Sequence, residues 1–382
     1  MSQVHATPSI CAILFGSGSV SNLNDALVLR PNQPDAETWS SWLDRFDDAT
    51  VYQTLPYGTE RYGRDAIRQL IVQGESGPTA VCQLIVKQTP LLGLGYAHAP
   101  WGPVWRTGGR EIDPQLAGRM LRALVEEFVV KRGLLLRLRF NVVAGTEGAA
   151  TVARVARSLG FLPLRTPDYP SYRLNLNPPL EGIRAGLKSN WRKHLNKAER
   201  QDLEIDSGTA MELIDRFEPL YAEMLARKQF GQHVGDVGLI RRVQQRQPEH
   251  HKFRVFICRH DGEDVAGIIV GKLGDSGMNE ISATTGVCRE RKLAAAHLLR
   301  WRVIEWLKSE NARYYELRGA QIESLRVFKE GVGGDLIHYV GSWEHAGARS
   351  SAAFVHAAEK AETSLLKVRQ FTNRMVRSRT SD

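Results

Sequence analysis

Residues 314–344 read YYELRGAQIESLRVFKEGVGGDLIHYVGSWE, and this stretch decides the fold class. The pattern predicts a strand over 313–317, a short helix over 324–331 that ends at Gly331, and a closing strand over 338–343. Directly upstream, residues 294–308 have the apolar spacing of a long amphipathic helix, and residues 253–260 and 265–272 predict a hairpin. This order of elements is typical of an α/β unit built around one sheet.

The first half of the chain has the same order of elements. It predicts a hairpin over 80–87 and 91–98, a helix over 114–131, a strand over 134–140, a helix over 148–159 and a strand over 171–176. Residues 134–140 then correspond to 313–317, and residues 156–161 correspond to 327–334. The pattern therefore predicts two similar α/β units that pack side by side.

The composition is that of a soluble globular protein, with 42% hydrophobic and 24% charged residues. The longest apolar runs, at 10–15 and 265–270, are far shorter than the roughly 18 residues of a membrane-spanning helix. The first run lacks a preceding cationic segment, so we expect no secretory leader. The expected location is the cytoplasm, with a peripheral contact to the inner face of the membrane left open.

The net charge of +9 favours an anionic partner, such as nucleic acid, a phosphate-bearing substrate or a membrane surface. Cysteines occur at 11, 82, 258 and 288 without CxxC spacing, so we expect reduced thiols and neither a zinc site nor disulfides. We interpret His250 and His251 as part of a polar loop and expect no metal. The sequence contains no nucleophile elbow, Walker A loop, HExxH pair or Rossmann glycine motif.

Residues 182–202 read GIRAGLKSNWRKHLNKAERQD and are strongly basic. On a helix, Trp191, Leu195 and Ala198 form one apolar stripe. The opposite side carries basic residues, namely Arg192, Lys193, Lys197 and Arg200. Such a helix is either a solvated charged surface or a surface that binds phosphate or tRNA.

Lys329 lies in a glycine-rich stretch with Gly331, Gly333 and Gly334, and alone it would be interpreted as a lysine at a helix end. A second informative stretch, 284–299, reads TTGVCRERKLAAAHLL. Acyl-CoA N-acetyltransferases carry a glycine-rich loop at this place, whose amides bind the cofactor pyrophosphate at a helix N-terminus. Residues 289–294 contain no glycine, which argues against an ordinary CoA site.

Several of these segments together resemble the Fem-type peptidoglycan-bridge aminoacyltransferases. The stretch 188–205 is similar to that family's basic helix, through Arg192, Leu195, Lys197, Ala198 and Arg200. The family's C-terminal signature resembles 296–308, 314–319, the motif Phe328-Lys329-x-Gly-x-Gly-Gly and the motif Tyr339-x-Gly-x-Trp343. Its N-terminal signatures resemble Tyr52-Gln53-Thr54 with Tyr57-Gly58, and Trp101-Gly102-Pro103-Val104. The resemblance covers about residues 37–345.

The resemblance implies an α/β (α+β) fold with two tandem GNAT-like domains, each a mixed sheet flanked by helices. We expect these domains at 37–180 and 181–345, after an irregular segment, 1–36, and before a basic helical tail, 346–382. The implied activity moves an amino acid from aminoacyl-tRNA to an amine of a cell-wall peptidoglycan precursor or a related glycan or peptide. It needs no cofactor, no metal and no covalent enzyme intermediate. Residues 211–247 are too few for the coiled-coil arm of the bridge-forming members, so the acceptor stays open.

The resemblance also implies roles for individual residues. Lys329 matches the motif lysine that stabilises the oxyanion or positions the ester, and Phe328 lies beside it. Arg61 falls near a family lysine that holds the phosphates of the precursor. The other expected substrate-binding residues are Arg192, Lys193, Lys197, Arg200, Arg318 and Tyr315. Proton acceptors are suggested only by proximity in sequence, and they are His297, His338, Glu316 and Asp335.

Two other functions remain open at this point. The same fold would serve an acyl-CoA-dependent N-acyltransferase of exopolysaccharide or secondary-metabolite biosynthesis, which would use acetyl-CoA. A non-catalytic alternative is a basic module that binds RNA or an anionic membrane, in which the tail arginines Arg374, Arg377 and Arg379 would matter most.

Overall fold

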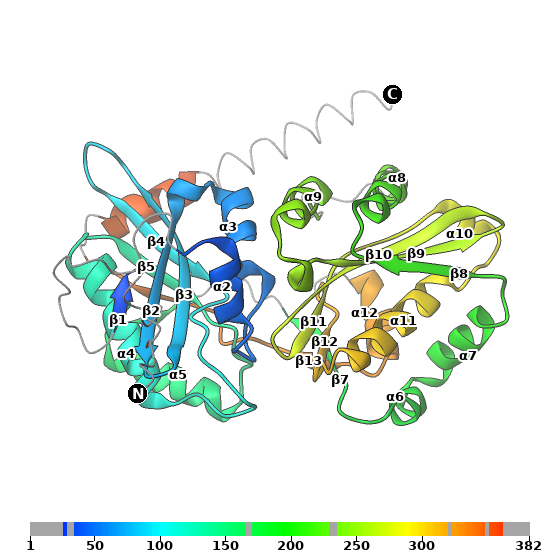
Figure 1. Ribbon diagram of the computed structural model, residues 1–382, viewed down its shortest axis with the longest axis horizontal. Helices are drawn as coiled ribbons and strands as arrows, with labels where there is room; N and C mark the ends of the chain where they lie inside the picture. The colour runs from blue at the N-terminus through cyan, green and yellow to red at the C-terminus, as the bar shows by residue number, and fades with distance from the viewer. Residues whose placement is uncertain are drawn as a thin grey trace, which may run out of the picture.

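The computed structural model describes residues 26–28, 34–164, 170–228, 235–319, 323–347 and 351–361. Two lobes lie side by side, each built on a seven-stranded mixed sheet with helices on its faces (Figure 1). The first sheet has the order β1 (Ala26–Val28), β2 (Ile67–Gly74), β3 (Gly77–Gln88), β4 (Gly95–Pro100), β5 (Leu135–Arg139), β14 (Ser342–His345) and β6 (Leu162–Pro163). The second has the order β13 (Asp335–Ile337), β7 (Ser171–Asn175), β12 (Tyr314–Glu316), β11 (Ser276–Thr284), β10 (Glu263–Leu273), β9 (Arg254–His260) and β8 (Glu204–Gly208). The predicted fold class is confirmed.

Helices cover both faces of each sheet. In the first lobe these are α2 (Ala36–Leu43), α3 (Leu55–Tyr62), α4 (Pro114–Leu124) with its continuation η3 (Val125–Val130), and α5 (Glu147–Ser158). In the second lobe they are α6 (Leu180–Gly186), α7 (Ser189–Ala198), α8 (Met211–Lys228), α9 (Val237–Arg246), α10 (Gly286–Glu290), α11 (Ala295–Ser309) and α12 (Glu323–Gly331). Local sequence explains both ends of the predicted helix 114–131. The Asp113 side chain caps its first turn, and Gly133, in a left-handed conformation at φ 65°, follows its last turn.

Strand residues alternate between the two faces of each sheet. In β10, Ile268 and Val270 pack with α7 and α11, whereas Ile269 packs on the other side with α8 and α9. In β2, Leu70 and Val72 join the core under α4 and α5, and Ile71 joins the core under α2. Each sheet is thus buried on both faces.

The two halves of the chain exchange their closing strands. Strand β7 pairs with β12 and β13 in the second sheet, and β14 pairs with β5 and β6 in the first. The expected boundaries at 180 and 345 therefore place each of these strands in the wrong lobe. The reason is packing, because Tyr172 and Leu174 of β7 belong to the core of the second lobe and Trp343 of β14 belongs to that of the first. The strand predicted over 338–343 overlaps β14 only at its end, because the chain crosses between the sheets over 338–341.

The lobes also interlock through side chains. Val51 and Tyr52 of the first lobe pack in the second-lobe cluster of α8 and α9, and Leu273 of the second lobe packs against α2. Polar contacts cross the junction as well, including Arg106 Nη2 to Asp275 Oδ2 at 2.8 Å. The junction is therefore a packed part of the molecule in which residues of both lobes can act together.

A helix over residues 351–361 packs on the first lobe. Ala352 and Val355 bury against Leu135, and Arg137 Nη1 donates to Glu359 Oε1 at 2.6 Å. This helix confirms part of the predicted helical tail, whereas Arg374, Arg377 and Arg379 lie outside the described residues. None of the helices in the described ranges is long and apolar enough to span a bilayer.

Candidate active site at the lobe junction

Lys329 on α12 is buried, with 5% of its surface exposed. Its Nζ donates a hydrogen bond to the backbone carbonyl of Arg318, which follows β12 in a left-handed conformation at φ 51°. Burial, together with the nearby charges of Arg300 and Arg318, lowers the pKa of Lys329 to about 7. Lys329 is therefore no ordinary surface lysine at a helix end.

Arg318 connects Lys329 to the first lobe. Its Nη1 donates to Glu280 Oε2 at 2.6 Å, and its guanidinium carbon lies 5.5 Å from the centre of the Tyr52 ring. The hydroxyl of Tyr52 donates to the same Glu280 oxygen at 3.1 Å. The structure thus brings together the segments around Tyr52, Arg318 and Lys329 that are far apart in the sequence.

Aromatic rings of both lobes surround this contact. Tyr52 lies 5.0 Å from Tyr57 and 6.0 Å from Trp101 between ring centres, and Trp101 lies 4.8 Å from Tyr339. Trp101 adopts φ 58°, which is rare for a bulky residue and is typical of functional sites. Arg61 lies one turn after Tyr57 on α3, exposed at the rim of these rings. The expected N-terminal signatures therefore line the junction.

Glu280 is the residue that sequence reasoning missed. In the pairing of β11 with β10, Ile281 opposes Ile269 and Asn279 opposes Val270, so Glu280 is the extra residue of a β-bulge. Only 9% of its side chain is exposed. The available signal was a single acid within a predicted strand, because an unpaired carboxylate is costly to bury.

Phe328 and Tyr315 support the site from inside the second lobe. Phe328 is half-buried, with its ring 5.0 Å from that of His297 and 5.9 Å from that of Trp191. Tyr315 has no exposed surface, and its hydroxyl accepts a hydrogen bond from Arg300. The expectation that Tyr315 contacts substrate is wrong, because the ring is part of the core and holds Arg300 in place.

The suggested proton acceptors lie in different surroundings. Glu316 is 2% exposed and accepts from Arg173 Nε at 2.8 Å. His297 stacks on His194, and burial lowers its pKa to about 4, so it is neutral near pH 7. His338 and Asp335 are exposed. Glu316 is thus held in an ion pair, and none of these residues is joined to Lys329 by a hydrogen bond within the described ranges.

Helix α7 buries its predicted apolar stripe, and one of its lysines is hydrogen-bonded to the backbone of a neighbouring loop. Lys197 Nζ donates to the carbonyl of Lys292 at 2.7 Å, and Gln201 Oε1 accepts from the amide of Ala294 at 2.9 Å. The second bond occupies one backbone amide at the N-terminus of α11, the place where a pyrophosphate would bind. Arg192 is half-buried and donates to the carbonyl of Leu187 at 3.4 Å.

The remaining cations of this region face solvent. Lys193, Arg200 and Lys292 are exposed, and within the described part of the chain none of them forms an ion pair. By contrast, Arg184 is paired with Glu199. We call the three residues Lys193, Arg200 and Lys292 the α7 basic face.

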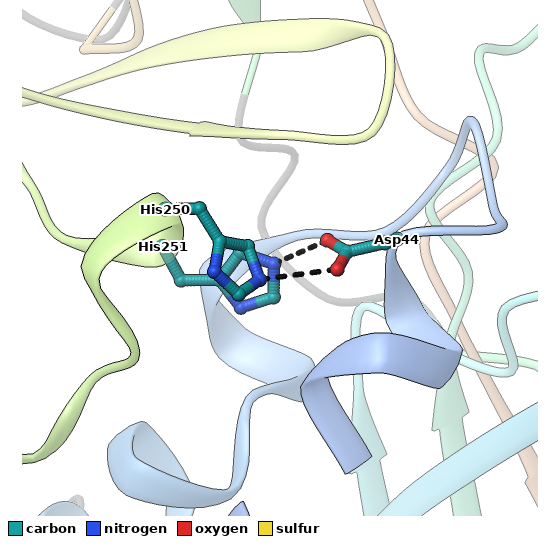
Figure 2. A group of neighbouring side chains, drawn as sticks. All are labelled: Asp44, His250 and His251. Atoms are coloured by element: carbon teal, nitrogen blue, oxygen red, sulfur yellow. Dashed lines mark hydrogen bonds and ion pairs between the residues drawn. The ribbon is translucent and has the colours of Figure 1, made fainter. Parts of the chain in front are cut away.

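A second cluster joins the lobes through imidazoles. Figure 2 shows His250 and His251 facing the Asp44 carboxylate, with His251 Nε2 2.6 Å from Oδ1 and His250 Nε2 3.1 Å from Oδ2. One nitrogen of each imidazole and one oxygen of Asp44, the atoms that could bind a metal ion, lie within 4.8 Å of one another. The two distances are those of hydrogen bonds from imidazole N–H groups to a carboxylate. His251 is 4% exposed, so the expected polar loop is wrong for this residue.

A pocket lies between these two clusters. Its lining includes Thr50 and Thr54 of the first lobe and His251, Lys272 and Glu280 of the second. We call it the junction pocket. Glu280 connects it to Arg318, and through Arg318 to Lys329.

Comparison with known proteins supports the fold at this point. Residues 185–327 match the family model of the acetyltransferase (GNAT) domain. The chain is similar to the crystal structure of FemX with a TM-score of 0.73 and 10% identity, over 86% of this chain and 99% of that one. A search of curated protein sequences finds no match.

Two further solved structures are similar over most of their length. L-PGS from Bacillus licheniformis has a TM-score of 0.53 and 13% identity, over 82% of this chain and 92% of that one. The C-terminal domain of a putative lysylphosphatidylglycerol synthetase from Agrobacterium fabrum has a TM-score of 0.52 and 14% identity, over 84% and 94%. The protein has a GNAT-like fold of two lobes. The predicted resemblance to the Fem-type proteins is confirmed at the level of the fold.

Proposed function

We propose that the protein is an aminoacyltransferase that moves an amino acid from aminoacyl-tRNA to the primary amine of a phosphate-bearing acceptor. A peptidoglycan precursor in the cytoplasm is the first candidate acceptor, following the Fem-type resemblance. The similarity to a lysylphosphatidylglycerol synthetase makes a lipid headgroup at the inner face of the membrane the second. The reaction needs no cofactor or metal beyond the co-substrate.

One observation carries the choice of acyl donor. Gln201 Oε1 already accepts from the Ala294 amide at the N-terminus of α11, so this amide is not available to the pyrophosphate of CoA unless Gln201 moves. Close to this helix end, the α7 basic face is exposed to solvent, where a phosphate backbone can bind it. This arrangement fits a tRNA better than it fits acetyl-CoA.

The chemistry follows from the position of Lys329. The neutral acceptor amine attacks the ester carbonyl, the bond from that carbon to the ribose oxygen breaks, and the amine proton passes to the leaving hydroxyl. A charged Lys329 beside Arg318 would stabilise the oxyanion that forms, which is worth several kcal/mol in a site closed to water. Holding both substrates at the lobe junction would supply much of the remaining rate.

The alternative is an N-acyltransferase that uses acyl-CoA. The match of residues 185–327 to the acetyltransferase (GNAT) domain favours it. It requires CoA to displace Gln201 from Ala294, or to bind elsewhere.

Binding measurements with a matched control test the proposal. Lys193→Glu with Arg200→Glu should weaken tRNA binding more than tenfold and lower the slope of log K against log salt by roughly 1 to 2. Arg110→Glu with Arg154→Glu makes the same charge change at exposed residues of the first lobe and should leave the affinity nearly unchanged. Equal losses in both variants would show that only net charge matters. Saturable heat on titration with acetyl-CoA would favour the alternative.

A further inference from the structure

Three residues that line the junction pocket each carry a buried polar atom without a partner. Thr50 Oγ1, His251 Nδ1 and Glu280 Oε1 form no hydrogen bond to any described residue. Thr50 is 5% exposed, His251 is 4% exposed, and the Glu280 side chain is 9% exposed. Leaving such groups unsatisfied costs about 1–3 kcal/mol each, so three in one pocket indicate a ligand.

The neighbours of these atoms fix their chemistry. The Asp44 carboxylate can only accept, so His251 donates through Nε2–H, and in the neutral imidazole Nδ1 carries a free lone pair. Glu280 already accepts from Arg318 and Tyr52 through Oε2, which leaves Oε1 as a second acceptor. The Thr50 hydroxyl can also accept. All three atoms can therefore receive a hydrogen bond, and two of them can do nothing else.

A primary ammonium group matches this set. It carries three N–H donors and no acceptor, whereas a water molecule has two donors and a carboxylate or phosphate has none. We propose that the junction pocket binds the primary ammonium group of a substrate, with Thr50, His251 and Glu280 as its three acceptors.

The charges around the pocket suit this ligand. The Glu280 carboxylate lines the pocket, and the Asp44 carboxylate is bonded to His251, which lines it as well. The cations nearby are Arg318, which engages the other oxygen of Glu280, and half-exposed Lys272, which also lines the pocket. Lys272 bonds to none of the three acceptors, so its own ammonium does not fill the site.

The proposed function provides two amines that could enter, and this part of the inference rests on it. One is the α-ammonium of the aminoacyl group, and the other is the acceptor amine before it loses its proton. Either would sit next to the contacts that run from Glu280 through Arg318 to Lys329. The pocket would thus hold an amine close to the proposed oxyanion site.

Calorimetry on the full chain tests the pocket without tRNA. The probes are alanine methyl ester, its N,N,N-trimethyl derivative, which keeps the charge but has no N–H donor, and its N-acetyl derivative, which has no charge. Only the first should bind measurably, with the trimethyl derivative at least tenfold weaker. Thr50→Val should weaken binding of alanine methyl ester roughly tenfold, because one hydrogen bond to a charged group is lost.

Two variants serve as controls. Thr151→Val makes the same change at a buried threonine of α5 and should leave binding unchanged. Lys272→Gln keeps the three acceptors and removes a cation from the pocket lining, so it should bind alanine methyl ester more tightly than the wild type. Equal binding of the trimethyl derivative, or no effect of Thr50→Val, would overturn the proposal and leave the pocket as a site for buried water.

Transfer kinetics then identify the amine. A rise in KM for aminoacyl-tRNA alone in Thr50→Val assigns the pocket to the α-ammonium, and a rise in KM for the acceptor alone assigns it to the acceptor amine. Wild-type protein that transfers nothing from aminoacyl-tRNA would refute the proposed function, whereas the calorimetric result would still decide on the pocket.

Discussion

Replacing Lys329 with methionine should stabilise the protein in a strongly pH-dependent way. The lysine is 5% exposed, and its pKa is lowered from 10.5 in the unfolded chain to about 7 in the fold. Between these values the unfolded chain binds more protons than the folded protein, so stability of the wild type rises with pH through that window. Below pH 7 the folded protein bears the full cost of a buried charge.

The size of the effect follows from the two pKa values. Integrating the proton difference from pH 6 to pH 9.5 gives about 2.4 pK units, or about 3 kcal/mol of unfolding free energy. The methionine variant lacks this contribution, although it loses the hydrogen bond to the Arg318 carbonyl, worth about 1 kcal/mol at every pH. The difference in stability between wild type and variant should therefore shift by about 3 kcal/mol across that range.

Urea denaturation of both proteins at the two pH values, followed by tryptophan fluorescence, measures this shift. All other titrating groups are shared, so they cancel in the comparison. An arginine elsewhere replaced by methionine, such as Arg154→Met on the surface of α5, should show no pH-dependent difference. If the Lys329→Met difference were the same at both pH values, Lys329 would titrate normally in the fold and the reasoning about its burial would be refuted.

Three further outcomes are expected. If the charged form of Lys329 acts on the oxyanion, kcat/KM for the aminoacyl donor should fall as the pH rises above about 7. Lys329→Arg should shift this fall to higher pH, and a profile that is flat across this range would contradict the role. Arg173→Met should destabilise by about 3–5 kcal/mol in urea denaturation, because it leaves Glu316 buried and unpaired, whereas adding Glu316→Leu should restore much of the loss; equal losses would contradict this. Gly277→Ala should lower the free energy of unfolding by about 1–3 kcal/mol, since the new Cβ would lie 2.3 Å from Leu307 Cδ2. Gly186→Ala is the control, because its new Cβ would have no atom within 4 Å, and this variant should melt like the wild type.

Much of the fold could be predicted because its signals are local. The helix over 114–131 and the helix α11 have continuous apolar faces and clear ends, and the structure places them as predicted. The apolar stripe of α7 is also buried as predicted. The exchange of β7 and β14 has no such signal, because a strand's pattern shows that one face is buried but not in which sheet. The boundaries predicted from the repeated order of elements therefore assign β7 and β14 to the wrong sheets.

The candidate site divides in the same way. Lys329 could be identified from its motif, and the structure adds the burial that makes it unusual. Glu280 and His251 could not, because their roles come from a β-bulge and from a contact with Asp44, which is 207 positions away from His251. Tyr315 illustrates the opposite error, since a polar aromatic residue beside a motif was expected to bind substrate and instead fills the core.

The most direct test of the central claim is the identity of the acyl donor. Purified protein is given a cell-wall precursor with either a pool of radiolabelled aminoacyl-tRNAs or labelled acetyl-CoA, and label on the acceptor is counted for wild type and for Lys329→Ala. We predict RNase-sensitive transfer from aminoacyl-tRNA by the wild type, and loss of that transfer in a Lys329→Ala variant that melts like a folded protein. Transfer of label from acetyl-CoA alone would contradict the account.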